Sequence, residues 1–136
     1  MARFPAAAVL ALLAVPAAAG EAAAPSCERA ETTADMRICL TQDLRAAEKA
    51  LQRYLEAARR EARPPEALEK SQAAWTGYRD AACRAAAGQY EGGSLRPVVA
   101  LDCLLRLTRE RTLELWRGYL ANEGTLPEPR SNTVTK

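Results

Sequence analysis

Apolar residues recur at alternating intervals of four and three positions along three segments of the chain. The first segment follows Thr32 and Thr33, either of which is suited to cap a helix, and Asp35 places negative charge in the first turn. Because this spacing aligns side chains on one face of a helix, it predicts a helix from about Thr32 to Arg63, where Pro64 ends it. Its apolar face comprises Met36, Leu40, Leu44, Ala47, Leu51, Tyr54 and Ala58.

Two further helices are predicted beyond the Pro64-Pro65 corner. Pro65 is well placed to open the second helix, which ends before the turn sequence Gly92-Gly93-Ser94. The third begins within residues 94–97 and ends by Gly124. The apolar face of the second comprises Leu68, Ser71, Trp75, Tyr78, Ala82 and Ala86, and that of the third Leu101, Leu105, Thr108, Thr112, Leu115 and Tyr119.

Short connections between long helices favour antiparallel neighbours, so the expected fold is all-α. We predict a three-helix antiparallel bundle with a long first helix, stapled by two disulfides. Composition agrees, since a chain of 136 residues suits one domain and its alanine, leucine, glutamate and arginine favour helix over sheet.

The N-terminal residues have the pattern of a secretory signal peptide. Arg3 supplies the basic start, an apolar run extends from Phe4 to Val15, and small residues follow up to Gly20. We therefore predict a signal peptide over residues 1–20, a helical domain over residues 21–124 and a disordered tail over residues 125–136. The expected location is periplasmic or secreted, with no transmembrane segment in the mature chain.

Charge and composition exclude several functions. The chain has no histidine, which removes histidine-based triads and histidine metal sites. Its formal net charge of +2 lacks the basic excess of a nucleic-acid binder. No pair of acids stands apart from ordinary helix-surface charge, so we expect no enzyme activity, no cofactor and no metal.

Export would place the four cysteines, Cys27, Cys39, Cys83 and Cys103, in an oxidising compartment. The predicted helices bring all four to one end of the bundle, which leaves three pairings open. We favour Cys27 with Cys39 and Cys83 with Cys103, because each pairing closes a short loop, worth about 3 kcal/mol in the chain-entropy model. Zinc is disfavoured because its ligands come in close pairs and no C-x2-C element is present.

One run of residues is distinctive: Trp75, Tyr78, Arg79, Asp80 and Cys83, read as W-x2-YRD-x2-C. It is followed by the Gly-Gly-Ser turn and then by Cys103, Thr108 and Arg111. This set resembles the LprI-like lysozyme-inhibitor family, and the resemblance implies an exported, disulfide-linked helical domain that inhibits lysozyme. The residues themselves also admit structural roles: Trp75 and Tyr78 as the bulk of the core, and Arg79 or Arg111 as partners of Asp80, Asp102 or Glu110 across helices.

Two functions follow as hypotheses. In the first, the protein inhibits a lysozyme, whose cleft holds two carboxyl groups, by inserting the loop over residues 89–96. Tyr90 would be the aromatic anchor, Ser94 a donor and Arg96 a charged partner, with Gly92 and Gly93 forming the turn. In the second, the protein is a non-catalytic envelope interaction or stress module that binds another envelope protein or a cell-wall component through the charged surfaces of the first helix. Those residues are Arg45, Glu48, Lys49, Arg53, Glu56, Arg59 and Arg60.

Overall fold

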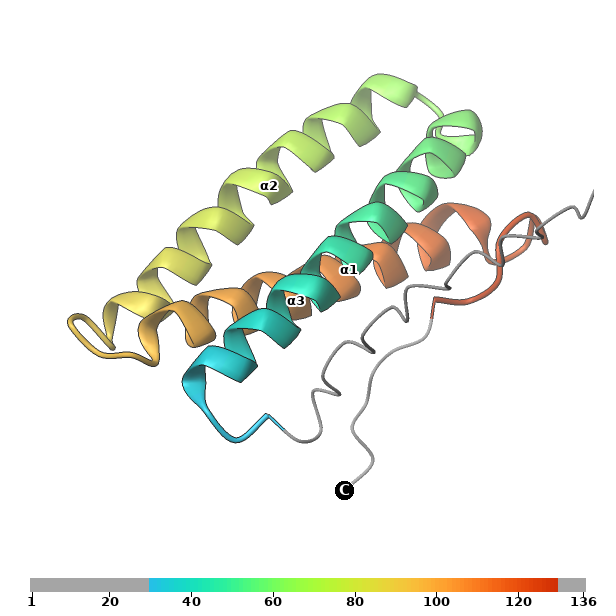
Figure 1. The fold of residues 1–136 in the computed structure, drawn as a ribbon. Helices are drawn as coiled ribbons and strands as arrows, with labels where there is room; N and C mark the ends of the chain where they lie inside the picture. The colour runs from blue at the N-terminus through green and yellow to red at the C-terminus, as the bar shows by residue number, and fades with distance from the viewer. Residues whose placement is uncertain (1–29, 130–136) are drawn as a thin grey trace, which may run out of the picture.

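A computed structural model describes residues 30–129, and all regular secondary structure in that range is helical. Helix α1 spans Thr33–Glu61, α2 spans Pro65–Gly88 and α3 spans Arg96–Leu115, and α3 continues into a π-helical turn, η2, over Trp116–Leu120. Figure 1 shows α1 and α2 running antiparallel from a shared corner, with α3 packed against both. The predicted three-helix all-α fold with a long first helix is therefore confirmed.

The start of α1 identifies which threonine caps the helix. The Thr32 hydroxyl accepts a hydrogen bond of 3.1 Å from the Asp35 backbone amide, which satisfies one of the amides left without an intrahelical partner. Most of the predicted apolar face is buried, and Met36 and Leu40 at its start are partly buried. The buried members of that face are Leu44, Ala47, Leu51, Tyr54 and Ala58.

An ion pair joins α1 and α2 beside their shared corner. Arg59 donates to Glu69 through Nε at 2.6 Å and through a terminal nitrogen at 3.2 Å. This side-chain hydrogen bond lowers the pKa of the Glu69 carboxyl and raises the pKa of the Arg59 guanidinium. Pro65 opens α2 as predicted, since a proline at the first helical position lacks only an amide that has no partner there.

Helix α3 supplies much of the core. Leu105, Thr108, Thr112 and Leu115 of its predicted apolar face are buried. The two threonines are accommodated because the Thr112 hydroxyl donates to the Thr108 carbonyl at 2.9 Å and the Thr108 hydroxyl accepts from Arg79 at 3.4 Å, so neither leaves a buried polar group unsatisfied. Leu115 packs with Leu51, Leu55, Ala58 and Leu68, which places the main hydrophobic cluster where all three helices meet.

The prediction for Tyr78 is wrong: its side chain is 61% exposed and takes no part in the core. The residues of α2 that face the bundle include Leu68, Trp75 and Cys83, and Arg79 lies on the same side. Bonding of Cys83 to α3 turns positions 79 and 75, spaced by four, toward the bundle. Tyr78, one residue from Arg79, is then rotated by about 100° toward solvent.

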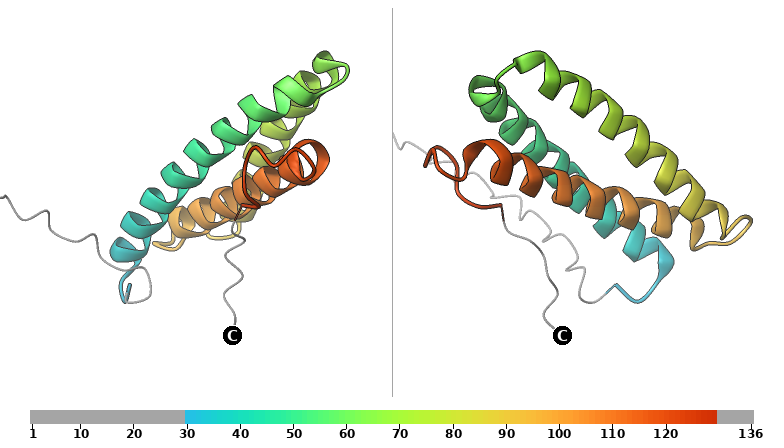
Figure 2. Two further views of the ribbon diagram at one scale, coloured as in Figure 1. Left: turned by 90° about the vertical axis from the view of Figure 1, so that its right-hand side faces the viewer. Right: turned by 180° about the vertical axis from the view of Figure 1, so that it is seen from behind.

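The first part of the predicted tail belongs to the domain. The Tyr54 hydroxyl donates to the Pro127 carbonyl at 2.7 Å, and Trp116 Nε1 donates to the Leu126 carbonyl at 3.1 Å. Leu126 also packs against the cluster formed by Tyr54, Ala57 and Leu120. Figure 2 shows this segment turning back beside the end of η2. The segment packs here because its backbone carbonyls accept hydrogen bonds from the buried Tyr54 hydroxyl and the half-buried Trp116 indole, which need partners.

The rest of the predicted tail, residues 130–136, and the predicted signal peptide, residues 1–20, lie outside the described residues. Within the described range, no helix combines the length and the hydropathy needed to cross a membrane.

Candidate functional site

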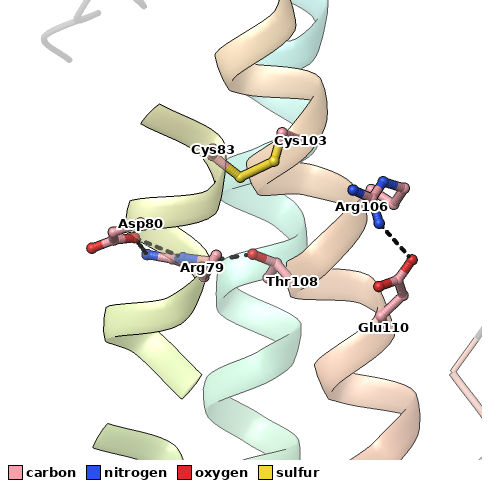
Figure 3. The surroundings of a disulfide bond; sticks show 7 residues. All are labelled: Arg79, Asp80, Cys83, Cys103, Arg106, Thr108 and Glu110. Carbon is pink, nitrogen blue, oxygen red and sulfur yellow. Dashed lines mark hydrogen bonds and ion pairs between the residues drawn. A yellow bond between two sulfur atoms is a disulfide. The ribbon is translucent and has the colours of Figure 1, made fainter. Parts of the chain in front are cut away.

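A disulfide joins α2 to α3 close to the connection between them. Cys83 and Cys103 are bonded, with their Cα atoms 5.5 Å apart, and both side chains are buried. Figure 3 shows the bond crossing directly from one helix to the other. This confirms one of the two predicted pairings. The other, Cys27 with Cys39, involves Cys27, which lies outside the described residues.

The α2–α3 loop, residues 89–95, is a chain of tight turns. Tyr90 N donates to Ala87 O at 3.1 Å, Gly93 N to Tyr90 O at 3.0 Å, and Arg96 N to Gly93 O at 3.2 Å. Gly92 has φ of 76°, which favours glycine, so the predicted positive-φ turn is present at that residue. Gly93 matters for a different reason, since a Cβ there would lie 3.3 Å from the Tyr90 carbonyl oxygen.

The loop side chains face solvent together at one tip of the bundle. Tyr90 and Leu95 are each 44% exposed, and Ser94 is exposed. The Arg96 side chain is 52% exposed and lies 4.0 Å from Glu91, a distance at the limit of an ion pair. The fold thus gathers every residue predicted for the inhibitory loop on one protrusion. Leu95 is exposed on the same loop, although it was not singled out as a contact residue. The sequence feature that could have indicated it is a large apolar residue directly after a Gly-Gly-Ser turn.

The loop is held at its base as well as within itself. The Cys83–Cys103 bond lies five residues before the end of α2 and seven after the start of α3, so the two helices cannot separate at that level without breaking a covalent bond. Restricting the free conformations of a binding loop reduces the entropy lost on binding. The geometry is therefore that of a short, exposed and pre-organised loop.

Apart from Tyr78, the rest of the distinctive motif lies at the contact between α2 and α3. The guanidinium carbons of Arg79 and Arg111 lie 5.2 and 5.9 Å from the centre of the Trp75 ring system. Arg79 also donates to the Thr108 hydroxyl at 3.4 Å and pairs with Asp80 at 3.0 Å, as Figure 3 shows, and lies 3.7 Å from Glu48 of α1. Thr108 is fully buried, so this contact lies inside the interface.

Arg111 makes the equivalent contact from the α3 side. It donates to the Gln72 side-chain oxygen at 3.1 Å and to the Ser71 hydroxyl at 2.9 Å, and it pairs with Glu114 at 3.2 Å. The pairs expected across helices, from Arg79 or Arg111 to Asp80, Asp102 or Glu110, are absent from the described residues, because Asp80 pairs with Arg79 within α2 itself. Glu110 pairs instead with Arg106 at 3.0 Å, one helical turn away.

A pocket of about 440 Å³ opens between α2 and α3 at the base of the loop. Its wall is mostly apolar, and it carries three charged side chains, Asp80, Arg84 and Arg96. A second pocket of about 330 Å³ lies where α1 and α3 meet the segment at Pro127, with Asp43, Arg53 and Arg109 among its lining. Among the described residues, no three histidine, cysteine or acidic side chains gather as a metal site would require.

These features define a class: a small, disulfide-braced helical domain that presents one exposed, internally hydrogen-bonded loop. A model of the family described as lysozyme inhibitor LprI matches residues 24–115, more than half of the chain. The chain therefore belongs to the LprI lysozyme inhibitor family, as the sequence motif indicated.

A second comparison finds an individual protein that is similar to this chain. The chain is 39% identical, over 106 residues, to an uncharacterized protein of Rhizobium meliloti (strain 1021), a match that covers 67% of this chain and 76% of the relative. No solved structure matches the chain.

Proposed function

We propose that this protein inhibits a lysozyme by inserting its α2–α3 loop into the glycan-cleaving cleft. Membership of the LprI family supports a lysozyme as the target. The observation that carries the choice of surface is Tyr90, a large aromatic side chain held 44% exposed on a hydrogen-bonded, disulfide-braced tip. Aromatic side chains on rigid protrusions are typical anchors of protein interfaces.

The loop chemistry is complementary to that cleft. A glycoside-cleaving cleft holds one carboxylic acid and one carboxylate, both able to accept hydrogen bonds. Arg96, whose side chain is 52% exposed and only loosely paired with Glu91, supplies a charge-assisted donor, and the Ser94 hydroxyl supplies a neutral one. Tyr90 and Leu95 add apolar surface beside them. In this proposal the loop blocks the glycan by binding, with no chemical step.

An inhibition assay tests this proposal. The purified, oxidised protein is titrated against lysozymes of several types, with turnover of cell-wall glycan as the readout. We expect stoichiometric inhibition of at least one type, and we expect Tyr90→Ala to weaken it about thirtyfold, the effect of losing about 2 kcal/mol at a binding hot spot. Ser94→Ala and Arg96→Gln should weaken it less.

Tyr78 provides the matched control. It is a second exposed tyrosine, 61% exposed, on α2 and outside the loop. Tyr78→Ala should leave inhibition unchanged. Inhibition that survives combined replacement of Tyr90, Ser94 and Arg96 would place the inhibitory surface elsewhere on the protein.

A second candidate is the envelope interaction module, for which α1 provides the surface. Arg45, Lys49 and Arg60 are exposed and make no ion pair within the described part of the chain, which leaves them available to an acidic partner. Glu48 and Arg59, from the same set, are instead paired with α2. Two results together would favour this candidate. The protein would inhibit no lysozyme type, and it would bind another envelope partner whose binding is lost on replacing Arg45, Lys49 and Arg60.

A further inference from the structure

The pocket at the base of the α2–α3 loop has the size and lining of a small-molecule site. Its volume of about 440 Å³ is larger than a single protein side chain fills. Small-ligand sites fall at roughly 300–1,000 Å³ and are mainly apolar with a few charged groups. Its apolar wall comprises Cys83, Ala87, Pro97, Ala100 and Leu104.

The charge lining this pocket is positive. Asp80 is already engaged by Arg79, with their closest side-chain atoms 3.0 Å apart. Arg84 makes no ion pair in the part of the chain that the structure describes, and Arg96 reaches Glu91 only at 4.0 Å. Two arginines without close acidic partners therefore line an apolar pocket whose one acid is neutralised.

The backbone of α3 adds to this potential. Arg96 and Pro97 in its first turn line the pocket, and this helix has neither a side-chain cap nor an acid in its first turn. The positive end of the helix dipole is thus unopposed by its own side chains. Placing Arg96 there is unfavourable for the helix alone, and an anion beside it would relieve the repulsion.

We propose that this pocket binds an amphipathic carboxylate, with the apolar body against Ala87, Ala100 and Leu104 and the carboxylate between Arg84 and Arg96. The apolar wall selects a hydrocarbon body, since removing such surface from water is the main driving force for binding in a pocket of this kind. The arginines select the head group, because a guanidinium binds a carboxylate through paired hydrogen bonds. This site shares Arg96 with the proposed inhibitory loop, whereas Arg84 and Ala100 lie outside the loop, so variants at those two positions distinguish carboxylate binding from lysozyme inhibition.

Nuclear magnetic resonance titration of the oxidised protein tests the proposal with three matched probes: octanoate, octanol and octylammonium. Octanoate should bind more tightly than octanol, and octylammonium should bind most weakly. The amide signals that shift should be those of Ala87, Ala100 and Leu104. Equal affinity for octanoate and octylammonium, or shifts spread over surfaces away from the pocket, would overturn the proposal.

Two substitutions separate the head-group contact from the apolar one. Arg84→Gln should weaken octanoate binding about threefold, as expected for an exposed ion pair, and leave octanol binding unchanged. Ala100→Leu should weaken both probes by filling the pocket. Arg60→Gln on α1, far from the pocket in sequence and on another helix, is the matched control and should change neither. Octanoate affinity that is equal in the wild type and in Arg84→Gln would contradict the assigned head-group site.

Discussion

The guanidinium carbon of Arg79 lies 5.2 Å from the centre of the Trp75 ring system, and the same arginine donates to the buried Thr108 hydroxyl on α3. Trp75 and Arg79 are four residues apart on α2, so both face the bundle. The YRD motif therefore divides into a structural part, in which Arg79 contacts α3 and pairs with Asp80, and Tyr78, which projects into solvent.

A double-mutant cycle tests this relationship. Trp75→Leu and Arg79→Leu should each destabilise the fold, and their effects should be less than additive by about 0.5–1 kcal/mol, the energy expected for a cation–π contact. Urea denaturation followed by circular dichroism measures the three variants. Strict additivity would show that the two side chains do not interact.

Loss of the disulfide should affect both stability and the loop. Replacing Cys83 and Cys103 together by serine should lower the free energy of unfolding by about 3 kcal/mol, because the unfolded chain gains the freedom of a loop with a sequence separation of 20. Inhibition by the folded variant should also weaken, since the loop would lose its brace. A variant of unchanged stability would contradict the bracing role.

The segment at Pro127 offers a test of where the domain ends. Tyr54→Phe removes only the hydroxyl that donates to the Pro127 carbonyl and should cost about 1 kcal/mol of unfolding free energy. Tyr78→Phe, at an exposed position, is the matched control and should cost nothing measurable. Deleting residues 125–136 should lower the free energy of unfolding at least as much as Tyr54→Phe. A deletion without effect on that free energy would show that the segment is a dispensable tail.

The corner ion pair predicts a pH dependence of stability. The hydrogen bond from Arg59 lowers the pKa of Glu69 in the folded protein. The pair therefore stabilises the fold at pH values above the ordinary glutamate pKa, which is about 4. Its contribution is lost as the pH falls through the lowered pKa. Glu69→Gln should therefore be slightly less stable than the wild type at neutral pH and equal to it in strong acid. Thermal melts across this range measure the difference, and a gap that widens on acidification would contradict the assignment.

The helices and the Cys83–Cys103 bond followed from sequence because both depend on local spacing. The pattern from Leu44 to Ala58 needs only helical periodicity, and the bond needs only a short hairpin. The orientation of α2 was predicted wrongly, because the apolar face was assigned from the large apolar residues, which favour Tyr78, and not from the position of Cys83. Counting back from Cys83 in steps of four gives Arg79 and Trp75, the residues that face the bundle.

The hydrogen-bond partners of the segment at Pro127 could not be predicted from the sequence either. Tyr54 belongs to the predicted apolar face of the first helix, and nothing local indicates that its hydroxyl and the Trp116 indole donate to carbonyls beyond the last helix. The loop candidates could be named in advance because Gly92-Gly93 predicts a turn. Their shared exposure and the adjoining pocket required the packing of α2 on α3.

The most direct test of the proposed inhibitory loop is to map the surface that contacts lysozyme. Amide signals of the isotopically labelled, oxidised protein are followed by nuclear magnetic resonance as an inhibited lysozyme is added, with and without a chitin oligosaccharide that occupies its cleft. If the loop enters the cleft, the signals of Tyr90, Gly92 and Gly93 change on addition and revert when the oligosaccharide competes. Changes confined to the outer surface of α1, or unaffected by the oligosaccharide, would contradict this proposal.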